Sequence, residues 1–174
     1  MGDINVYTGP IRCGKSNKIL DEAKRQMIAG KKIIIFKPEI DTEDYITDRN
    51  GNKIKTERIS CIEDIKKYEA DVYIIDEFQF LKGDINCIEQ MAAEGKKFYI
   101  AGINLTSERK PFGMMGDLLC VSDNVQTMTS ICGICNRDNA IFSYYKFNDK
   151  CSDIRIGKTE YIPVCRACYN ELKK

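Results

Sequence analysis

The 174-residue chain contains no histidine. Imidazole is a common metal ligand in proteins, so any metal site in this chain must use sulfur or oxygen ligands. Histidine is also the usual general base near neutral pH, so any base here must be a carboxylate, a lysine, a tyrosine or a cysteine. The missing residue type therefore narrows both the metal chemistry and the acid–base chemistry of the protein.

The sequence also lacks the segments that direct a protein to a membrane. No apolar run approaches the roughly 20 residues that span a bilayer, and the start MGDINVYTG has neither the basic residues nor the apolar stretch of a signal peptide. Nor is there a basic excess, because 27 Lys and Arg stand against 26 Asp and Glu. Dedicated nucleic-acid binders are normally basic. We therefore expect a cytoplasmic protein with no membrane or nucleic-acid partner.

The apolar pattern predicts an α/β domain over residues 1–128. Short, mainly apolar segments predict strands over residues 4–7, 32–36, 72–75 and 97–101. Helix signals fall between them, over residues 15–29, 62–68 and 83–94. The polar stretch 39–55 is predicted as a long connection between elements. Strands that alternate with helices favour a mainly parallel sheet covered by helices on both faces.

A glycine-containing loop joins the first predicted strand to the first predicted helix. Residues 9–16 read Gly-Pro-Ile-Arg-Cys-Gly-Lys-Ser, which matches the phosphate-loop motif G-x-x-x-x-G-K-[ST]. In this motif backbone N–H groups surround phosphate oxygens, the Lys reaches the β- and γ-phosphates, and the Ser hydroxyl binds Mg²⁺. We therefore predict a P-loop NTPase-like fold, an ordinary glycine turn being the alternative. The predicted ATP and Mg²⁺ site comprises Gly9, Pro10, Ile11, Arg12, Cys13, Gly14, Lys15 and Ser16.

Two acidic residues follow the predicted strand at 72–75. A P-loop enzyme needs a further acidic group for its metal, usually at the end of another buried strand, and Asp76 occupies that position. Glu77 then suits the role of a base that takes a proton from an attacking hydroxyl or water. Gln79 follows closely and joins the predicted ATP and Mg²⁺ site. The alternative for Glu77 is a solvated residue with no catalytic role.

Four of the nine cysteines form two C-x-x-C pairs, Cys132 with Cys135 and Cys165 with Cys168. Two such pairs can close a tetrahedral zinc site. All four ligands would be thiolates, so no position remains for water and the predicted zinc is structural. Free buried cysteines or a redox pair are the alternative.

The strand–helix alternation stops near Met128, and cysteine pairs and turns replace it. We therefore predict a second domain over residues 129–174, a small zinc ribbon. The zinc would fix both ends of the long loop between the two cysteine pairs, and a loop held at its base is suited to cover a substrate.

The order of these motifs resembles that of the type II thymidine kinases. The phosphate loop is followed by Asp-Glu-Phe-Gln-Phe at 76–80, Arg-Lys-Pro-Phe-Gly at 109–113 and the two cysteine pairs. Residues 47–50, Thr-Asp-Arg-Asn, are similar to the family's segment that carries an Asp and an Arg beside the phosphates. The resemblance therefore adds Asp48 and Arg49 to the predicted ATP site. It covers nearly the whole chain.

The resemblance implies transfer of the γ-phosphoryl group of ATP to the 5′-hydroxyl of a deoxynucleoside, with thymidine as the default substrate. Glu77 would accept the proton, while Lys15, Ser16 and Asp76 would bind phosphate and Mg²⁺. The resemblance also implies a homo-oligomer, specifically a tetramer, that is inhibited by the triphosphate end product. From the family's nucleoside-binding parts we expect a substrate site formed by Ile103, Ser107, Phe112, Phe142, Ile156, Gly157 and Tyr161.

The chain departs from the family in this substrate site. Family members have an Asp and then an aromatic residue before Arg-Lys-Pro-Phe-Gly, where this chain has Asn104 and Ser107. The aromatic stacks on the thymine ring, an interaction worth about 1–3 kcal/mol that serine does not supply. Phe142 stands where the family has a Thr near the thymine methyl group. The pocket could hold thymidine or prefer another or a modified pyrimidine.

Two hypotheses from other classes remain open. The first is a catalytically silent, nucleotide-binding regulator of the same fold, and the intact Lys15, Ser16, Asp76 and Glu77 argue against it. The second is an ATPase or helicase-like motor, which would need an arginine finger and a nucleic-acid surface. A motor would also leave Arg-Lys-Pro-Phe-Gly and the cysteine pairs unexplained.

Overall fold

The computed structural model describes residues 2–47, 51, 53–146 and 160–173. Its centre is a six-stranded sheet with the strand order β5-β2-β6-β7-β1-β8. Every pairing in this sheet is parallel. The strands are β1 (Ile4–Thr8), β2 (Ile33–Pro38), β5 (Glu57–Ile59), β6 (Val72–Ile75), β7 (Lys97–Gly102) and β8 (Asn124–Thr127). The four strands predicted from apolar runs are β1, β2, β6 and β7, which confirms the mainly parallel sheet.

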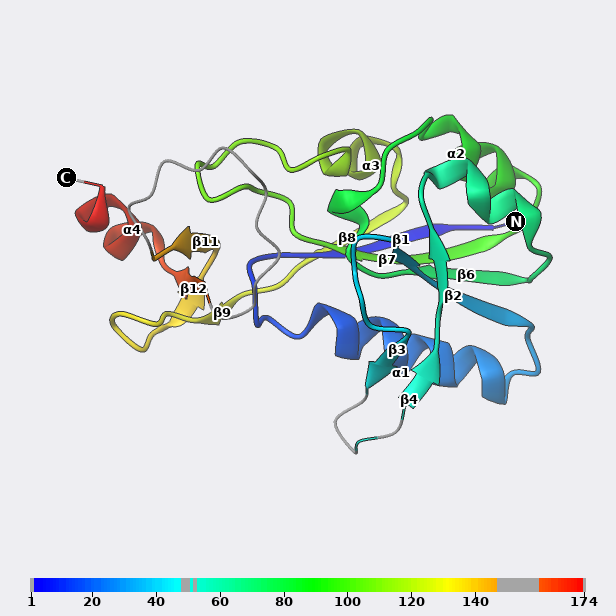
Figure 1. Cartoon of the computed structure of the whole chain (residues 1–174), viewed down its shortest axis with the longest axis horizontal. Coiled ribbons are helices and arrows are strands. Elements are labelled where there is room, and N and C mark those ends of the chain that lie inside the picture. The colour runs from blue at the N-terminus through cyan, green and yellow to red at the C-terminus, as the bar shows by residue number, and fades with distance from the viewer. Residues whose placement is uncertain (1, 48–50, 52, 147–159, 174) are drawn as a thin grey trace.

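Helices cover both faces of this sheet (Figure 1). One face packs against α1 (Lys15–Ile28), and the other packs against α2 (Asn86–Ala93), α3 (Met115–Val121) and the 3₁₀ helix η1 (Ile62–Lys67). The strand β6 shows why both faces need cover, because all four of its side chains are buried. Val72 and Ile74 point toward α1, while Tyr73 and Ile75 point toward α2 and α3. The predicted α/β architecture is therefore correct.

The stretch 39–55 is more structured than the predicted long connection. It contains an antiparallel hairpin of β3 (Tyr45–Thr47) and β4 (Lys53–Lys55). Ile46, 4% exposed, and Ile54 anchor the hairpin on the α1 side of the core. The few apolar residues in this polar stretch gave too weak a pattern to predict strands. The helix expected over 62–68 is a 3₁₀ helix, and α3, β5 and β8 were not predicted.

The cysteine region, defined here as residues 129–146 and 160–173, forms a smaller unit at one end of the molecule (Figure 1). It contains two antiparallel strand pairs and one helix, and its core includes Phe142, Val164 and Tyr169. The elements are β9 (Ser130–Ile131), β10 (Asp138–Ala140), β11 (Phe142–Tyr145), β12 (Tyr161–Val164) and α4 (Arg166–Leu172).

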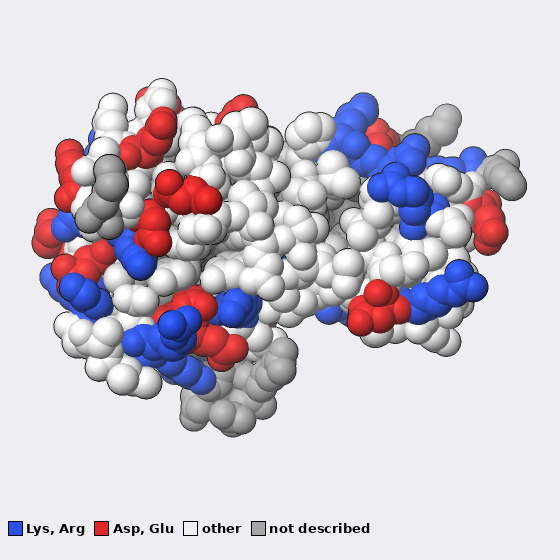
Figure 2. All heavy atoms as spheres, turned by 180° about the vertical axis from the view of Figure 1, so that it is seen from behind, with Lys and Arg blue, Asp and Glu red and all other residues white. Residues whose placement is uncertain are grey.

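Charged side chains of both signs are interspersed on the face seen in Figure 2. They gather toward the two ends of the molecule, and mainly uncharged side chains lie between them. This face therefore shows no continuous basic surface among the described residues. Among the same residues, no helix combines the length and apolar character needed to cross a membrane.

Candidate active site

The phosphate loop curls around the side chain of Lys15. Its ammonium group donates hydrogen bonds to the carbonyl oxygens of Pro10 at 2.7 Å and Gly9 at 3.2 Å, and the residue is 8% exposed. Gly9 has a φ of 149°, and a Cβ there would lie 2.3 Å from the carbonyl oxygen of Met128. Only glycine fits at this position. The N–H groups in the first turn of an α-helix have no partner within the helix, so those at the start of α1 can bind an anion held in the loop.

Asp76 lies at the carboxyl end of β6, beside the start of α1. It is 4% exposed, and the Ser16 hydroxyl lies near its carboxylate. Burial, and next the charge of Glu77, raise the pKa of Asp76 to about 7, against the polar contact with Ser16 and the charge of Lys37. A bound cation would favour the ionised form of such a buried carboxylate. An oxygen pair from Ser16 and Asp76 therefore fits Mg²⁺, which prefers oxygen ligands.

Lys37, which sequence reasoning missed, lies near this site at the end of β2. The residue is 4% exposed, and its ammonium forms an ion pair with Asp41 at 2.9 Å. It comes directly after the strand predicted over residues 32–36, and buried positions rarely carry charge, so it was not singled out. The signal available in the sequence was a lysine at the carboxyl end of a buried strand, where open α/β folds bind their ligands.

Glu77 is held in a conformation that is unfavourable for most residues. Its backbone is left-handed, with φ 54° and ψ 38°. Its N–H donates to Asp76 Oδ1 at 3.0 Å, and Gln79 Nε2 donates to Glu77 Oε2 at 2.5 Å. Backbone strain of this kind persists where surrounding contacts enforce it, and it concentrates at functional sites. The observed strain therefore supports a functional role for this carboxylate.

Gln79 connects Glu77 to the segment that follows β7. Its Oε1 accepts a hydrogen bond from the Ile103 N–H at 2.9 Å. Phe112 packs edge-on against Phe80 with ring centroids 5.4 Å apart. The predicted substrate residues Ile103 and Phe112 thus lie against the acidic segment. This is the carboxyl edge of the parallel sheet, where open α/β folds bind their ligands.

The segment 103–113 turns back on itself and reaches the cysteine region. Thr106 N–H donates to the Lys110 carbonyl at 2.9 Å, and Phe112 N–H donates to the Asn104 carbonyl at 3.0 Å. At the tip, the Ser107 carbonyl accepts a hydrogen bond from the Tyr169 hydroxyl at 2.7 Å. Arg109 places its guanidinium 4.9 Å from the Tyr169 ring centre. The tip of this segment is therefore docked on α4.

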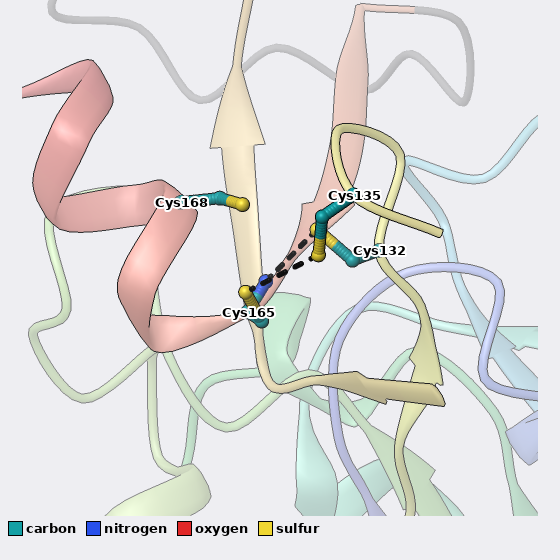
Figure 3. A group of neighbouring side chains, drawn as sticks. All are labelled: Cys132, Cys135, Cys165 and Cys168. Atoms are coloured by element: carbon teal, nitrogen blue, oxygen red, sulfur yellow. Dashed lines mark hydrogen bonds between the residues drawn. The ribbon is translucent and has the colours of Figure 1, made fainter. Parts of the chain in front are cut away.

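The four cysteines predicted to bind zinc come together in the fold (Figure 3). Their sulfur atoms all lie within 4.8 Å of one another. The sulfurs of Cys135 and Cys165 are 3.8 Å apart, and tetrahedral zinc with Zn–S bonds of about 2.3 Å would place its ligands about 3.8 Å apart. The predicted pairing of the two C-x-x-C turns is confirmed, and the cluster is compatible with zinc.

Backbone donors surround one of these sulfurs. Burial would raise the pKa of Cys132, but N–H groups of Cys135, Cys165 and Ile134 directed at its sulfur lower the pKa to about 6. The Cys165 N–H lies 3.4 Å from it. Such donors stabilise a thiolate, which is the form that binds a metal.

The sequence profile of the thymidine kinase family matches residues 2–169. The chain belongs to the thymidine kinase family. It is 35% identical to a thymidine kinase of Mycoplasma mobile over 98% of this chain and 88% of that protein. It is also 35% identical to one of Bacteroides thetaiotaomicron, over 97% of this chain and 87% of that one. With a thymidine kinase of Myxoma virus the identity is 32%, over 97% of this chain and 96% of the viral protein.

A solved structure that resembles this member of the thymidine kinase family is a genome packaging NTPase from Sulfolobus turreted icosahedral virus 2 in complex with ATPγS. The two chains are 17% identical, with a TM-score of 0.46, and the match covers 74% of this chain and 75% of the viral one.

Two further predicted substrate residues of this thymidine kinase family member, Phe142 and Tyr161, lie in the cysteine region. Phe142 is 4% exposed in the core of the cysteine region, with its ring 5.0 Å from that of Tyr169. Its neighbour Ser143, which was not predicted, faces the phosphate loop and accepts a hydrogen bond from the Ile11 N–H at 3.0 Å. Tyr161 lies beside Tyr145, with ring centroids 5.2 Å apart. Asp48, Arg49, Ile156 and Gly157 lie outside the described residues.

Proposed function

We propose that this chain transfers the γ-phosphoryl group of ATP to the 5′-hydroxyl of thymidine, giving dTMP and ADP. Membership of the thymidine kinase family supports this function. The observation that carries it is the closeness of Ser16 to the buried Asp76, directly beside the strained Glu77. A phosphate loop, a metal-binding carboxylate and a base thus meet at one edge of the sheet, as phosphoryl transfer requires.

On the phosphate side, Lys15 and the N–H groups at the start of α1 would bind the phosphates. Lys15 is already directed into the loop by the carbonyls of Gly9 and Pro10. Ser16 and Asp76 would hold Mg²⁺ together with its waters, and when bound this ion supplies charge neutralisation at the phosphates. The predicted Asp48 and Arg49 would complete this side. Lys37, beside Asp76, adds positive charge at the same edge of the sheet.

We assign Glu77 the role of the base that accepts the proton of the thymidine 5′-hydroxyl. As that oxygen forms its bond to the γ-phosphorus, the bond from the γ-phosphorus to the bridging oxygen breaks and ADP leaves. The proton passes to the Glu77 carboxylate. Gln79 holds one carboxylate oxygen at 2.5 Å, so the other oxygen is the one we assign to the proton. Positioning of this kind makes general base catalysis effective.

The acceptor side is assigned to the segment 103–113 and the cysteine region. Ile103, Ser107 and Phe112 would line it from the first, and Tyr161 from the second, with Ile156 and Gly157 as further predicted contacts. Phe142 lies in the core of the cysteine region. We therefore assign it a supporting role behind the pocket wall, without contact with the base. One structural zinc on the four cysteines would hold this side together.

Three further properties are proposed from family membership. The active form is a homo-oligomer, specifically a tetramer. The triphosphate end product inhibits it. The protein acts in the cytoplasm.

A nucleoside panel tests the proposed function. Purified protein with ATP and Mg²⁺ is offered thymidine, deoxyuridine, deoxycytidine and 5-substituted deoxyuridines, and the products are separated by chromatography. We expect dTMP, formed together with an equal amount of ADP. ATP hydrolysis with no nucleoside phosphorylated would contradict the proposal and favour an ATPase. Nucleotide binding without any turnover would favour a silent regulator.

The same panel tests the acceptor. A 5-substituted deoxyuridine used well in preference to thymidine would retain the kinase and change its substrate. We would attribute such a preference to Ser107, which replaces the aromatic residue that stacks on the thymine ring in the family.

A further inference from the structure

The cysteine region is bonded directly to the phosphate loop. The chain leaves β8 beside this loop, where the Met128 N–H donates to the Thr8 carbonyl at 2.7 Å. The Met128 carbonyl then lies against Gly9, at the position a side chain would need. In Figure 1 the loop at the start of α1 accordingly lies next to β9. The entry to the cysteine region therefore runs along the phosphate loop.

Two buried serines of the cysteine region continue this contact. Ser130, at the start of β9, donates its hydroxyl to the Arg12 carbonyl at 3.1 Å. Ser143, in β11, accepts the Ile11 N–H at 3.0 Å. The serines are 8% and 5% exposed, so water has little access to either bond. The N–H of Ile11 and the carbonyl of Arg12 are thus held by hydroxyl groups from outside the nucleotide-binding domain.

The two bonds act on the strained half of the loop. Arg12 has a left-handed backbone with φ 58°, which is unfavourable for a residue other than glycine. One serine bonds the N–H of Ile11, the residue before this strained position, and the other bonds the carbonyl of Arg12 itself. Strained backbone persists only where its surroundings enforce it. The other half of the loop, residues 14–16, would supply the N–H groups at the start of α1 to a bound phosphate.

We infer that Ser130 and Ser143 are positioning residues for the phosphate loop, through which the cysteine region sets the affinity for the nucleotide as well as for the nucleoside. The inference rests on one part of the proposed function, which is that the phosphate loop binds ATP. Neither serine is assigned contact with the reacting atoms. Both act by holding the Ile11–Arg12 backbone in the shape that the phosphates need.

Direct nucleotide binding tests this inference without any catalysis. Binding of ADP with Mg²⁺ is measured by calorimetry, with no nucleoside present, for Ser143→Ala, Ser130→Ala and the control Thr129→Ala. Thr129 is exposed and adjacent to Ser130. Loss of a hydrogen bond to a buried backbone group should weaken ADP binding by roughly 5- to 30-fold in each serine variant. The control should bind ADP as the wild type does, and Ser143→Thr, which keeps the hydroxyl, should restore much of the affinity.

Hydrogen exchange provides the structural readout. In Ser143→Ala the amide of Ile11 should exchange faster, while the amides of β1 keep their protection. Zinc content and thermal unfolding are measured for every variant. If Ser143→Ala does not fold, Ser130→Ala still decides the matter, because its lost bond is to a different peptide group.

Steady-state kinetics separate this role from contact with the base. The KM for ATP should rise in step with the weaker ADP binding, and the KM for thymidine should stay within about twofold. ADP affinity within twofold of wild type in both folded alanine variants would overturn the inference. So would a change confined to the KM for thymidine. If no nucleoside is phosphorylated at all, weaker ADP binding by the serine variants still supports the inference.

Discussion

The two sides of the candidate active site are built in different ways. On the phosphate side, short continuous motifs lie at the carboxyl ends of parallel strands, such as Gly9–Ser16 after β1 and Asp76–Glu77 after β6. The acceptor side is assembled from segments far apart in the sequence. The hydrogen bond from Tyr169 to the Ser107 carbonyl, for example, joins residues 62 positions apart. Changes on the first side should therefore lower the rate of reaction. Changes on the second should mainly alter nucleoside affinity, except at Ser130 and Ser143, which bond the phosphate loop.

The largest effect is expected for Glu77→Gln on the phosphate side. The amide keeps the shape of the side chain but cannot accept the proton, so kcat should fall by roughly 10²-fold to 10⁴-fold. Thymidine and ATP binding, measured by calorimetry, should change little. Glu89→Gln, an exposed position in α2, serves as the matched control with normal kcat. Near-normal turnover by Glu77→Gln would remove this residue from its assigned role.

The next effect should come from the acceptor side, with Cys168→Ser. Loss of one sulfur ligand should leave well under one zinc per chain by elemental analysis, and the KM for thymidine should rise by about tenfold or more. Cys120→Ser, at an exposed cysteine of α3, should keep both zinc and KM. Full zinc content in Cys168→Ser would show that this cysteine is not a ligand. An unchanged KM despite lost zinc would separate the cysteine region from nucleoside binding.

A smaller effect, in the opposite direction, is expected for Ser107→Phe. An aromatic ring at this position should stack on the base, and stacking of this kind contributes about 1–3 kcal/mol. The KM for thymidine should therefore fall, by roughly fivefold or more. The bond to Tyr169 uses the backbone carbonyl, so the substitution leaves it in place. Ser107→Leu adds apolar volume without a ring, and an equal gain by both variants would show that stacking is not the cause.

The same division explains what could be predicted from the sequence. The phosphate loop and Asp76–Glu77 were readable because each motif is continuous and follows a short, mainly apolar strand. Ser143 and Lys37 were not, because their roles come from neighbours distant in sequence, such as Ile11 for Ser143. Phe142 illustrates the same limit. Alternation along β11 puts Phe142 and Ser143 on opposite faces, and only the fold shows that Phe142 packs in the core.

The smallest effect concerns stability rather than catalysis, and it lies in the α/β part of the molecule. Asp64 accepts hydrogen bonds from Ser60, Cys61 and Lys67, and the Lys67 contact leads the causes that hold the pKa of Asp64 well below its usual range. A carboxylate with a lowered folded pKa stabilises the fold above its unfolded pKa of about 4, and the stabilisation is lost as the pH falls below that value. Asp64→Asn should therefore lower the free energy of unfolding by about 0.5–1 kcal/mol at pH 7.

Urea unfolding of the wild type and Asp64→Asn at several pH values measures this difference. The gap between the two proteins should be widest near neutral pH and should narrow between about pH 4 and pH 2 as Asp64 takes up its proton. Zinc content at pH 7 should be equal in both proteins, because Asp64 lies in η1 of the α/β part and not in the cysteine region. A gap that stays constant down to pH 2 would mean that the charge of Asp64 contributes nothing. A gap that appears only when zinc is lost would place the stabilising contact in the cysteine region instead.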